Sequence, residues 1–473
     1  MHPTEAVNVT DWNELKPRIL NLVKPTEEES LKVLRFSEKL IEDVNRVLEA
    51  EGFEARAELH GSVTHGTWVS GSEDLDVFIV LDPKYRREDL HKVLGVLKRS
   101  LDGDYVEAYA EHPYLQVAMG GFSVDMVPCF RLEKGGTIRS STDRTPLHSE
   151  YLAEALTDEM RDEVRILKLF TETVGVYGAE IRVQGFSGYL CELLIVKYGS
   201  FWGLAAEAVD WRSGEVVSLD HCLDEDALRK SFDDPLIIMD PTDASRNVAS
   251  ALSQESYWTF VAACRGFTEK PDLKYFVHEE DASSETVLNL MENHGSDYVF
   301  LVVYEHKADV PDSLWGQLHK SQQALRQTLE TDGFDVVRSS AWSDERHRHI
   351  FVFQLESSTI PGVTKHVGPP VSMAKNAESF LETHLGSEAT ESGPWIEGDR
   401  WVVLLRRRHT EAKELLEERL RDGGRGVGIS RKLAVRILQH HRILVNGEIR
   451  DYLVDGFEKH LYRVLVGRPH WVE

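Results

Sequence analysis

Cysteine is scarce in this sequence. Four cysteines occur among 473 residues, and no two of them form a Cys-x-x-Cys pair. This spacing argues against a zinc ribbon or a dithiol redox centre, and the low count excludes a disulfide-stapled secreted scaffold. We therefore expect reduced, buried thiols at Cys129, Cys191, Cys222 and Cys264.

Long apolar runs are also missing. The longest one, Tyr298–Tyr304, is far shorter than the ~20 residues that a membrane helix needs. The N-terminal segment MHPTEAVNVTDW is polar and lacks the apolar core of a signal peptide. These features predict a soluble cytoplasmic protein.

Positively charged residues are also few relative to negatively charged ones. The sequence has 54 Lys and Arg residues against 80 Asp and Glu residues, which gives a net charge of −26. Taken alone, this balance argues against a nucleic-acid partner, because phosphates attract basic surfaces. The bases are mostly arginine, 34 against 20 lysines. An acidic, lysine-poor chain is compatible with salt adaptation and also with a biased genomic base composition, and both readings stay open.

What the sequence does contain is typical of a globular protein, with 41% hydrophobic and 28% charged residues. At roughly 100–200 residues per domain, the length predicts about three or four domains. The apolar pattern predicts a multidomain α+β protein. Residues 1–145 alternate helices and strands around one mixed sheet, and residues 146–268 are mainly helical. Residues 269–370 show a β-α-β-β succession that is ferredoxin-like or RRM-like, and residues 371–473 form a C-terminal tail.

Three acids stand out in the first region. A Gly-Ser turn at Gly61 and Ser62 follows a predicted strand, and such a turn exposes backbone N–H groups where a phosphate can lie. Asp74 and Asp76 come next, in a strand whose apolar residues point the other way, so that both carboxylates share one face. Asp125 is the lone charge in a later apolar strand.

Carboxylates gathered on one face repel each other unless a cation lies between them. Hard oxygen ligands of this kind suit a divalent metal, and three of them can hold two Mg²⁺ ions. The alternative is that the three acids are solvated residues at strand edges. The order Gly-Ser, Asp-x-Asp and then a single strand Asp favours the metal site.

This order resembles the DNA polymerase β-type nucleotidyltransferase superfamily, and longer blocks narrow the resemblance. They are similar to the archaeal, class I CCA-adding enzymes, which are CTP/ATP:tRNA nucleotidyltransferases. The blocks are Gly61–Phe78, Val124–Cys129, Asp143–His148, Val176–Glu180, Gly185–Val196 and Asp240–Ala249. The resemblance is close over residues ~30 to ~270. From ~290 to ~370 it lies in the pattern of residues more than in their identity, and beyond ~370 it is weak.

The resemblance implies a fold, a reaction and a set of site residues. It implies a catalytic head (1–145), a helical neck with nucleotide-recognition residues (146–268), a tRNA-binding body (269–370) and a tRNA-binding tail (371–473). Asp74, Asp76 and Asp125 would be catalytic and hold Mg²⁺. Contacts to the nucleotide would come from Ser62, His65, His112, Thr145, His148, Lys168, Tyr177 and Arg246. His65 stands where the family usually has Arg, and Arg246 would help to select C or A.

The implied partners are tRNA, CTP and ATP, with a possible homodimer. Between Arg406 and Arg442 the sequence has 11 Arg or Lys residues against 5 Asp or Glu residues, a local excess of positive charge. This segment predicts contacts with tRNA phosphates on the acceptor stem and TΨC arm, while a solvated charged helix is the alternative. The predicted contacts are Arg406, Arg407, Arg408, Arg431 and Lys432.

The expected reaction is the addition of C, C and A to a tRNA 3′ end without a nucleic-acid template, with release of pyrophosphate. One alternative is another polymerase β-type RNA nucleotidyltransferase, such as a poly(A) polymerase or an oligoadenylate synthetase-like enzyme. A non-catalytic RNA-binding or scaffold protein is a further alternative. The intact set of three acids argues against it.

Overall fold

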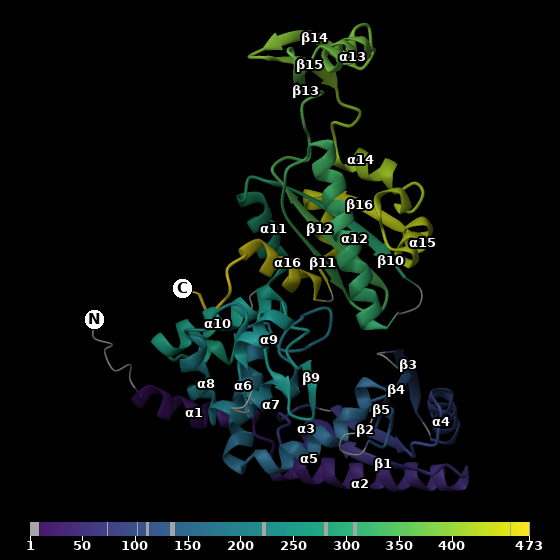
Figure 1. Ribbon diagram of the computed structural model, residues 1–473, viewed down its shortest axis with the longest axis vertical. Coiled ribbons are helices and arrows are strands. Elements are labelled where there is room, and N and C mark those ends of the chain that lie inside the picture. The colour runs from purple at the N-terminus through teal and green to yellow at the C-terminus, as the bar shows by residue number, and fades with distance from the viewer. Residues whose placement is uncertain are drawn as a thin grey trace. The chain divides into compact units, whose positions relative to one another are not determined.

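The computed structural model describes residues 9–72, 74–101, 103–109, 113–132, 138–219, 224–278, 282–305, 310–454 and 456–472. His112 and Cys222 lie outside these ranges. The chain divides into two compact units (Figure 1). Unit 1 comprises Met1–Glu279 together with Pro469–Glu473, and unit 2 comprises Glu280–Arg468. No helix in the described ranges is long and apolar enough to cross a membrane.

Unit 1 begins with a five-stranded sheet in the order β1-β2-β5-β4-β3. The strands are β1 (Ala55–His60), β2 (Asp74–Leu81), β3 (Asp104–Tyr109), β4 (Pro113–Met119) and β5 (Phe122–Phe130). β2 and β5 are parallel and the other pairs are antiparallel. This mixed sheet confirms the fold predicted for the first region.

Two helices, α2 (Glu27–Ala50) and α4 (Arg87–Ser100), cover one face of this sheet (Figure 1). The predicted capping box starts α2, because Thr26 Oγ1 accepts from the Glu29 backbone N–H while the Glu29 carboxylate accepts from the Thr26 N–H. Leu75 and Val77 of β2 point into this helix-covered core. Strand alternation therefore places Asp74 and Asp76 on the opposite face.

The predicted Gly-Ser turn is instead the start of a short helix, α3 (Gly61–His65). Gly61 has φ +72°, which favours glycine, and a Cβ there would overlap the Asp76 carboxylate. The chain leaves α3 through Gly66, also in the left-handed region. The prediction of a turn was wrong because a helix of this length depends on its neighbours more than on its own sequence.

The rest of unit 1 is mainly helical, as predicted. Its helices are α1 (Val9–Val23), α5 (Thr145–Ala155), α6 (Asp158–Thr173), α7 (Gly188–Tyr198), α8 (Phe201–Ala208), α9 (Glu225–Ser231) and α10 (Gln254–Glu269), with the 3-10 turns η1 (Ser141–Arg144) and η2 (Leu273–Tyr275). Two short strand pairs were not expected: β6 (Glu215–Val216) with β7 (Leu236–Ile237), and β8 (Met239–Asp240) with β9 (Asp243–Asn247). Cys191 and Cys264 are buried in this core and Cys129 in the sheet, with free thiols as expected.

Unit 2 contains the predicted ferredoxin-like sheet, with order β11-β12-β10-β16 and antiparallel pairing throughout. Its core elements are β10 (Asp297–Tyr304), α12 (Pro311–Asp332), β11 (Val336–Ser343), β12 (Arg348–Leu355), α15 (Arg431–Gln439) and β16 (His441–Val445). The fourth strand comes from residues far beyond 370. The boundary predicted at residue 370 therefore does not coincide with the end of this sheet.

Helices cover both faces of the ferredoxin-like sheet. α12, α14 (Ala412–Arg419) and α15 pack on one face, and α11 (Ser284–Asn293), the 3-10 turn η4 (Asn446–Tyr452) and α16 (Phe457–Val466) pack on the other. An RRM reads RNA bases on an open sheet face. The strand order agrees with both predicted shapes, but helices cover the two faces on which bases would stack.

An insertion follows β12. It is a three-stranded sheet in the order β13-β15-β14 with one helix, made of β13 (Val363–Pro370), α13 (Ala374–His384), β14 (Thr390–Glu397) and β15 (Arg400–Arg406). The chain then returns to the ferredoxin-like layers through α14 and the 3-10 turn η3 (Arg425–Val427).

Candidate active site

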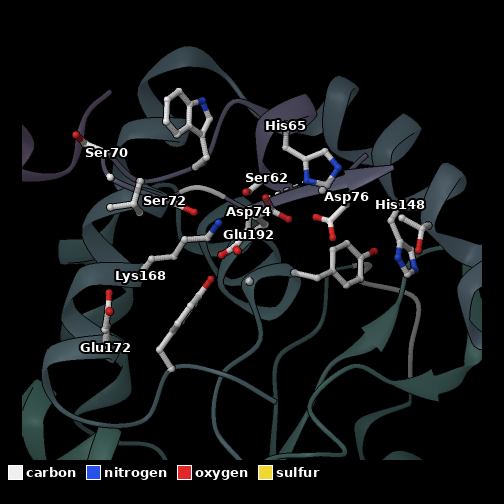
Figure 2. Close-up of a pocket in the computed structure, with 18 residues that line it drawn as sticks. Ser62, His65, Ser70, Ser72, Asp74, Asp76, His148, Lys168, Glu172 and Glu192 are labelled. Carbon is white, nitrogen blue, oxygen red and sulfur yellow. Dashed lines mark hydrogen bonds and ion pairs between the residues drawn. The ribbon is translucent and has the colours of Figure 1, made fainter. Parts of the chain in front are cut away.

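A pocket of about 630 Å³ opens in unit 1 between α3, β2, α5, α6 and α7. Figure 2 shows side chains from these elements around one space, with Lys168 and Asp76 directed into it. Eight of the predicted site residues line it: Ser62, His65, Asp74, Asp76, Thr145, His148, Lys168 and Tyr177. The residues that the sequence scatters over more than a hundred positions therefore meet in one place.

The three predicted acids lie on neighbouring strands. Asp76 of β2 and Asp125 of β5 are direct partners in the parallel register, so their side chains share a face with Asp74. Burial and the charge of Asp74 raise the pKa of Asp76. Burial and the charge of Asp76 raise the pKa of Asp125 to about 6, although a hydrogen bond from Gln116 Nε2 (3.1 Å) opposes the shift.

The raised pKa values indicate whether the carboxylates of Asp76 and Asp125 suit a divalent cation. Burial and neighbouring carboxylates disfavour the charged forms of Asp76 and Asp125, and a cation between hard carboxylate oxygens would reverse that. Within the described ranges, no three His, Cys, Asp or Glu side chains lie so that they could hold a metal ion together. Mg²⁺ usually takes one or two carboxylates and completes its shell with water and substrate phosphates, so these residues fit it.

Lys168 and Tyr177 face the pocket from the side of α6. The Lys168 ammonium is buried and donates to the Thr67 carbonyl oxygen (3.1 Å). Gly188 leaves room for both groups, since a Cβ there would lie 3.3 Å from Tyr177 Oη and 3.7 Å from Lys168 Nζ. Burial raises the pKa of Tyr177, which therefore stays a neutral hydroxyl. This side of the pocket offers a cation and a hydroxyl donor to an anion.

His148 marks the other end of the pocket. Its Nε2 lies 2.8 Å from Asp240 Oδ2, and its ring stacks on Tyr189 with centroids 4.0 Å apart. Arg246 Nη1 donates to the same Asp240 oxygen at 2.8 Å. Burial opposes ionisation of Asp240, but the hydrogen bonds from His148, Thr242 and Arg246 hold its pKa well below the usual range. Arg246 is thus connected to His148, which lines the pocket, because both bind the same oxygen of Asp240.

Sequence reasoning missed several residues of this site, among them Tyr189 and Glu192 in the pocket wall and Asp240 behind His148. These three lie within blocks that the sequence analysis had singled out. Glu192 could have been found, because it is the lone acid in the apolar helix α7. Asp240 could not, because its two partners come from α5 and from β9 across an unexpected hairpin.

The predicted basic contacts lie in unit 2, and the structure separates them into two groups. Arg406 pairs with Glu391 and Arg408 with Glu418, both at 2.7 Å. Arg407 Nη1 donates to the Asp332 carbonyl oxygen at 2.8 Å. Arg431 and Lys432 lie at the start of α15 and are exposed, as are Arg406 and Arg408.

Comparisons with protein families match most of the chain in three parts. A nucleotidyltransferase domain matches residues 38–148, the second domain of a tRNA nucleotidyltransferase matches residues 162–277, and the C-terminal domain of a CCA-adding enzyme matches residues 295–446.

Curated relatives match over nearly the whole length. The CCA-adding enzyme of Methanothermobacter thermautotrophicus is 36% identical over 436 residues, which cover 89% of this chain and 92% of that protein. The CCA-adding enzyme of Halobacterium salinarum is 36% identical over 401 residues, covering 85% of this chain and 87% of that protein.

Solved structures resemble the chain more distantly. CdnC of E. coli MS115-1 with ATP gives a TM-score of 0.43 at 16% identity, covering 56% of this chain and 94% of that one. A cytoplasmic RNA terminal U-transferase gives 0.45 at 13% identity, covering 57% and 99%. Neither similarity is strong enough to bear on the chemistry of the pocket.

Proposed function

Because the chain belongs to the family of CCA-adding enzymes, we propose that it adds C, C and A to the 3′ end of tRNA without a nucleic-acid template. The tRNA 3′ hydroxyl attacks the α-phosphate of CTP twice and then of ATP. A phosphodiester bond forms, the bond between the α- and β-phosphates breaks, and pyrophosphate leaves. The observation that carries this proposal is the meeting of Asp74, Asp76 and Lys168 in one pocket, with Asp125 beside Asp76.

The acids supply the charge that this reaction needs. At neutral pH Asp125 is largely ionised, because its pKa is raised only to about 6. Asp74, Asp76 and Asp125 would hold Mg²⁺ in a two-metal arrangement, which lowers the pKa of an attacking hydroxyl and neutralises charge on the phosphates. Gly61 brings α3 close to Asp76, and Ser62 on α3 thereby lies beside the acids.

The remaining pocket residues divide by position. Lys168 and Tyr177 would bind the triphosphate, together with Ser62. His148, Thr145 and Arg246 would contact the nucleotide at the other end, where Asp240 fixes two of them. The contact expected from His112 stays a prediction.

We further propose that unit 2 binds tRNA at the acceptor stem and TΨC arm. The predicted roles of head (1–145), neck (146–268), body (269–370) and tail (371–473) stay part of this proposal, as do a homodimer and a cytoplasmic location. Arg406, Arg408, Arg431 and Lys432 are all exposed, so each of them can reach a phosphate.

Nucleotide incorporation tests the reaction. Purified protein, Mg²⁺ and labelled CTP or ATP are offered to one tRNA transcript ending at the discriminator base and to another ending in CC, at low and at molar salt. We expect two C additions and one A addition, lost in Asp76→Ala. Untemplated A-tailing of an RNA without tRNA structure would indicate a poly(A) polymerase instead.

Salt dependence tests the tRNA contacts. A variant carrying Arg431→Ala and Lys432→Ala should bind tRNA more weakly and lower the slope of log K against log salt by about 1 to 2, because two phosphate contacts are lost. The variant carrying Arg406→Ala and Arg408→Ala tests the other two exposed bases in the same way. An unchanged slope in both variants would contradict the proposed phosphate contacts.

A further inference from the structure

Helix α7 places one carboxylate in the wall of the pocket. Glu192 is buried, with 2% of its surface exposed, and follows Gly188 by one turn on the same helix face. Figure 2 shows it in the same space as Lys168 and Asp74. A buried negative charge is unexpected beside a site for a triphosphate, since like charges repel. The partners of Glu192 explain its presence.

One carboxylate oxygen of Glu192 connects three parts of the pocket. Oε1 lies 3.0 Å from His65 Nδ1, at the end of α3, and accepts from Thr67 Oγ1 at 2.5 Å. The Thr67 carbonyl oxygen in turn accepts from the Lys168 ammonium on α6. Burial opposes ionisation of Glu192, but the hydrogen bond and charge of His65 and the charge of Lys168 hold its pKa below the usual range. The carboxylate is therefore ionised and accepts both bonds.

His65 has no ring nitrogen left for a phosphate in this arrangement. Its Nδ1 faces Glu192, and its Nε2 lies 2.9 Å from Ser149 Oγ. The same hydroxyl lies 2.9 Å from His60 Nδ1. An imidazole has two nitrogens, so a phosphate oxygen could bind His65 only by displacing Glu192 or Ser149. The ring thus links α3 to α5 and α7.

We propose that Glu192 is a positioning residue for the nucleotide triphosphate. Through His65 it fixes α3, which carries Ser62, and through Thr67 it fixes the ammonium group of Lys168. His65 acts as a link in this arrangement and not as a phosphate ligand. The inference rests on the proposed function, in which CTP and ATP occupy this pocket. Small displacements of positioning groups are known to cost large factors in rate or affinity.

Two conservative substitutions separate the effect of the position of the Glu192 side-chain oxygens from the effect of their charge. Glu192→Gln keeps the side-chain length and one acceptor oxygen but removes the charge. Glu192→Asp keeps the charge but withdraws the oxygens by one methylene group. We expect Glu192→Asp to raise the KM for CTP and ATP by about 10-fold or more, while its kcat and its KM for tRNA stay within about 3-fold of the wild type. For Glu192→Gln we expect all three constants to stay within about 3-fold of the wild type. The reverse ranking would show that charge matters and overturn the proposal.

Glu163→Asp is the matched control. Glu163 is another buried carboxylate of unit 1, on α6, where it pairs with Lys16 and accepts from the Phe201 N–H at 2.8 Å. It does not line the pocket. Its shortening should leave the KM for CTP and ATP unchanged. An equal rise would mean that general loosening of the core explains the Glu192 result.

A double-mutant cycle tests the link through His65. His65→Ala and Glu192→Asp should be non-additive in nucleotide affinity, because both break the same connection. Additive effects would make His65 an independent phosphate ligand and overturn the proposal. If Glu192→Asp does not fold, Thr67→Val removes the other bond to Glu192 and should raise the KM for both nucleotides, whereas an unchanged KM would contradict the proposed positioning.

Equilibrium binding of CTP and ATP in the absence of tRNA is measured for the same variants by calorimetry. If the wild-type protein binds both nucleotides but extends no tRNA, the proposed reaction fails while the binding series still decides the role of Glu192. If it extends tRNA and Glu192→Asp binds nucleotides normally, the positioning role alone fails.

Discussion

Asp125 shows the opposing demands of stability and chemistry on a single residue. Its pKa, raised from 3.8 to about 6, means that the folded protein holds the carboxyl proton more tightly than the unfolded chain does. The free energy of unfolding therefore falls as pH rises between these values, and the full penalty is present above pH 6. A residue that costs stability at neutral pH is one kept for another purpose.

Asp125→Asn should therefore stabilise the protein and inactivate it. With divalent cations chelated at pH 7.5, we expect the free energy of unfolding to rise by on the order of 1–2 kcal/mol, and the gain to vanish near pH 4. Added Mg²⁺ should raise the melting temperature of the wild type and not of the variant. Thermal melts at both pH values, with and without Mg²⁺, check this, and equal Mg²⁺ responses would contradict the assigned ligand.

Asp240 acts on two nucleotide-facing residues at once. Asp240→Ala removes the acceptor shared by His148 and Arg246, so we expect kcat/KM for CTP and ATP to fall by about 10- to 100-fold and discrimination against GTP and UTP to weaken. Single-nucleotide incorporation assays with the four triphosphates measure this. Asp233→Ala, at an exposed acid just before β7, should change discrimination by less than about 3-fold, and an equal effect would show a general loss of stability instead.

Helix α2 shows how an element can hold a site that it does not itself line. Glu29 caps the helix and also accepts from Ser70 Oγ at 2.8 Å, in a segment that lines the pocket. The backbone N–H of Thr26 and the hydroxyls of Ser70 and Thr26 lower the pKa of Glu29 to about 2. A lowered pKa means that this stabilisation is present above pH 4.5 and is lost as pH falls towards 2.

Glu29→Gln should lower the free energy of unfolding by about 1 kcal/mol at pH 7, the usual size of a capping contribution. The difference from the wild type should shrink as pH falls below 4.5, where the Glu29 carboxylate of the unfolded chain begins to gain its proton. Urea denaturation across pH 3–7 checks this. Glu28→Gln, in the same helical turn, is the control and should shift stability by less than about 0.5 kcal/mol.

At the scale of the whole molecule, the two ends of the chain belong to one unit. Trp471 is 7% exposed, lies in the same core as Trp12, and stacks on Tyr275 with centroids 6.1 Å apart. The chain thus forms unit 2 and then returns its last residues to unit 1. The core of unit 1 therefore contains residues from near both ends of the sequence.

Trp471→Ala should destabilise unit 1 by about 2–4 kcal/mol, because a large buried ring is removed. Amide hydrogen exchange should speed up in η2, whose Tyr275 stacks on the ring, and in α10, which belongs to the same core, and stay unchanged in α12 of unit 2. Trp258→Ala, on the exposed face of α10 where the ring is 40% exposed, is the control and should have little effect. Faster exchange throughout both units would show instead that they unfold together.

Local pattern sufficed for much of the fold. Alternation in β2 determined that Asp74 and Asp76 share a face, because side chains alternate in any strand. The place of Asp125 beside Asp76 depends in addition on the parallel pairing of β2 with β5. Thr26 and Glu29 determined where α2 begins, because a capping box satisfies its bonds within four residues. The two-residue strand β8 and the five-residue helix α3 were missed, because elements this short depend on their surroundings.

The amino-acid sequence by itself determined the chemical character of this protein: its acids, their strand faces and the order of blocks that places it in its family. Only the tertiary structure decided which groups act together. His65 and Glu192 are 127 positions apart and share a hydrogen bond, and β16 joins a sheet whose other strands end at Leu355. The reason is physical: side-chain direction follows from local backbone geometry, whereas contacts between distant residues depend on how whole elements bury their apolar faces against each other.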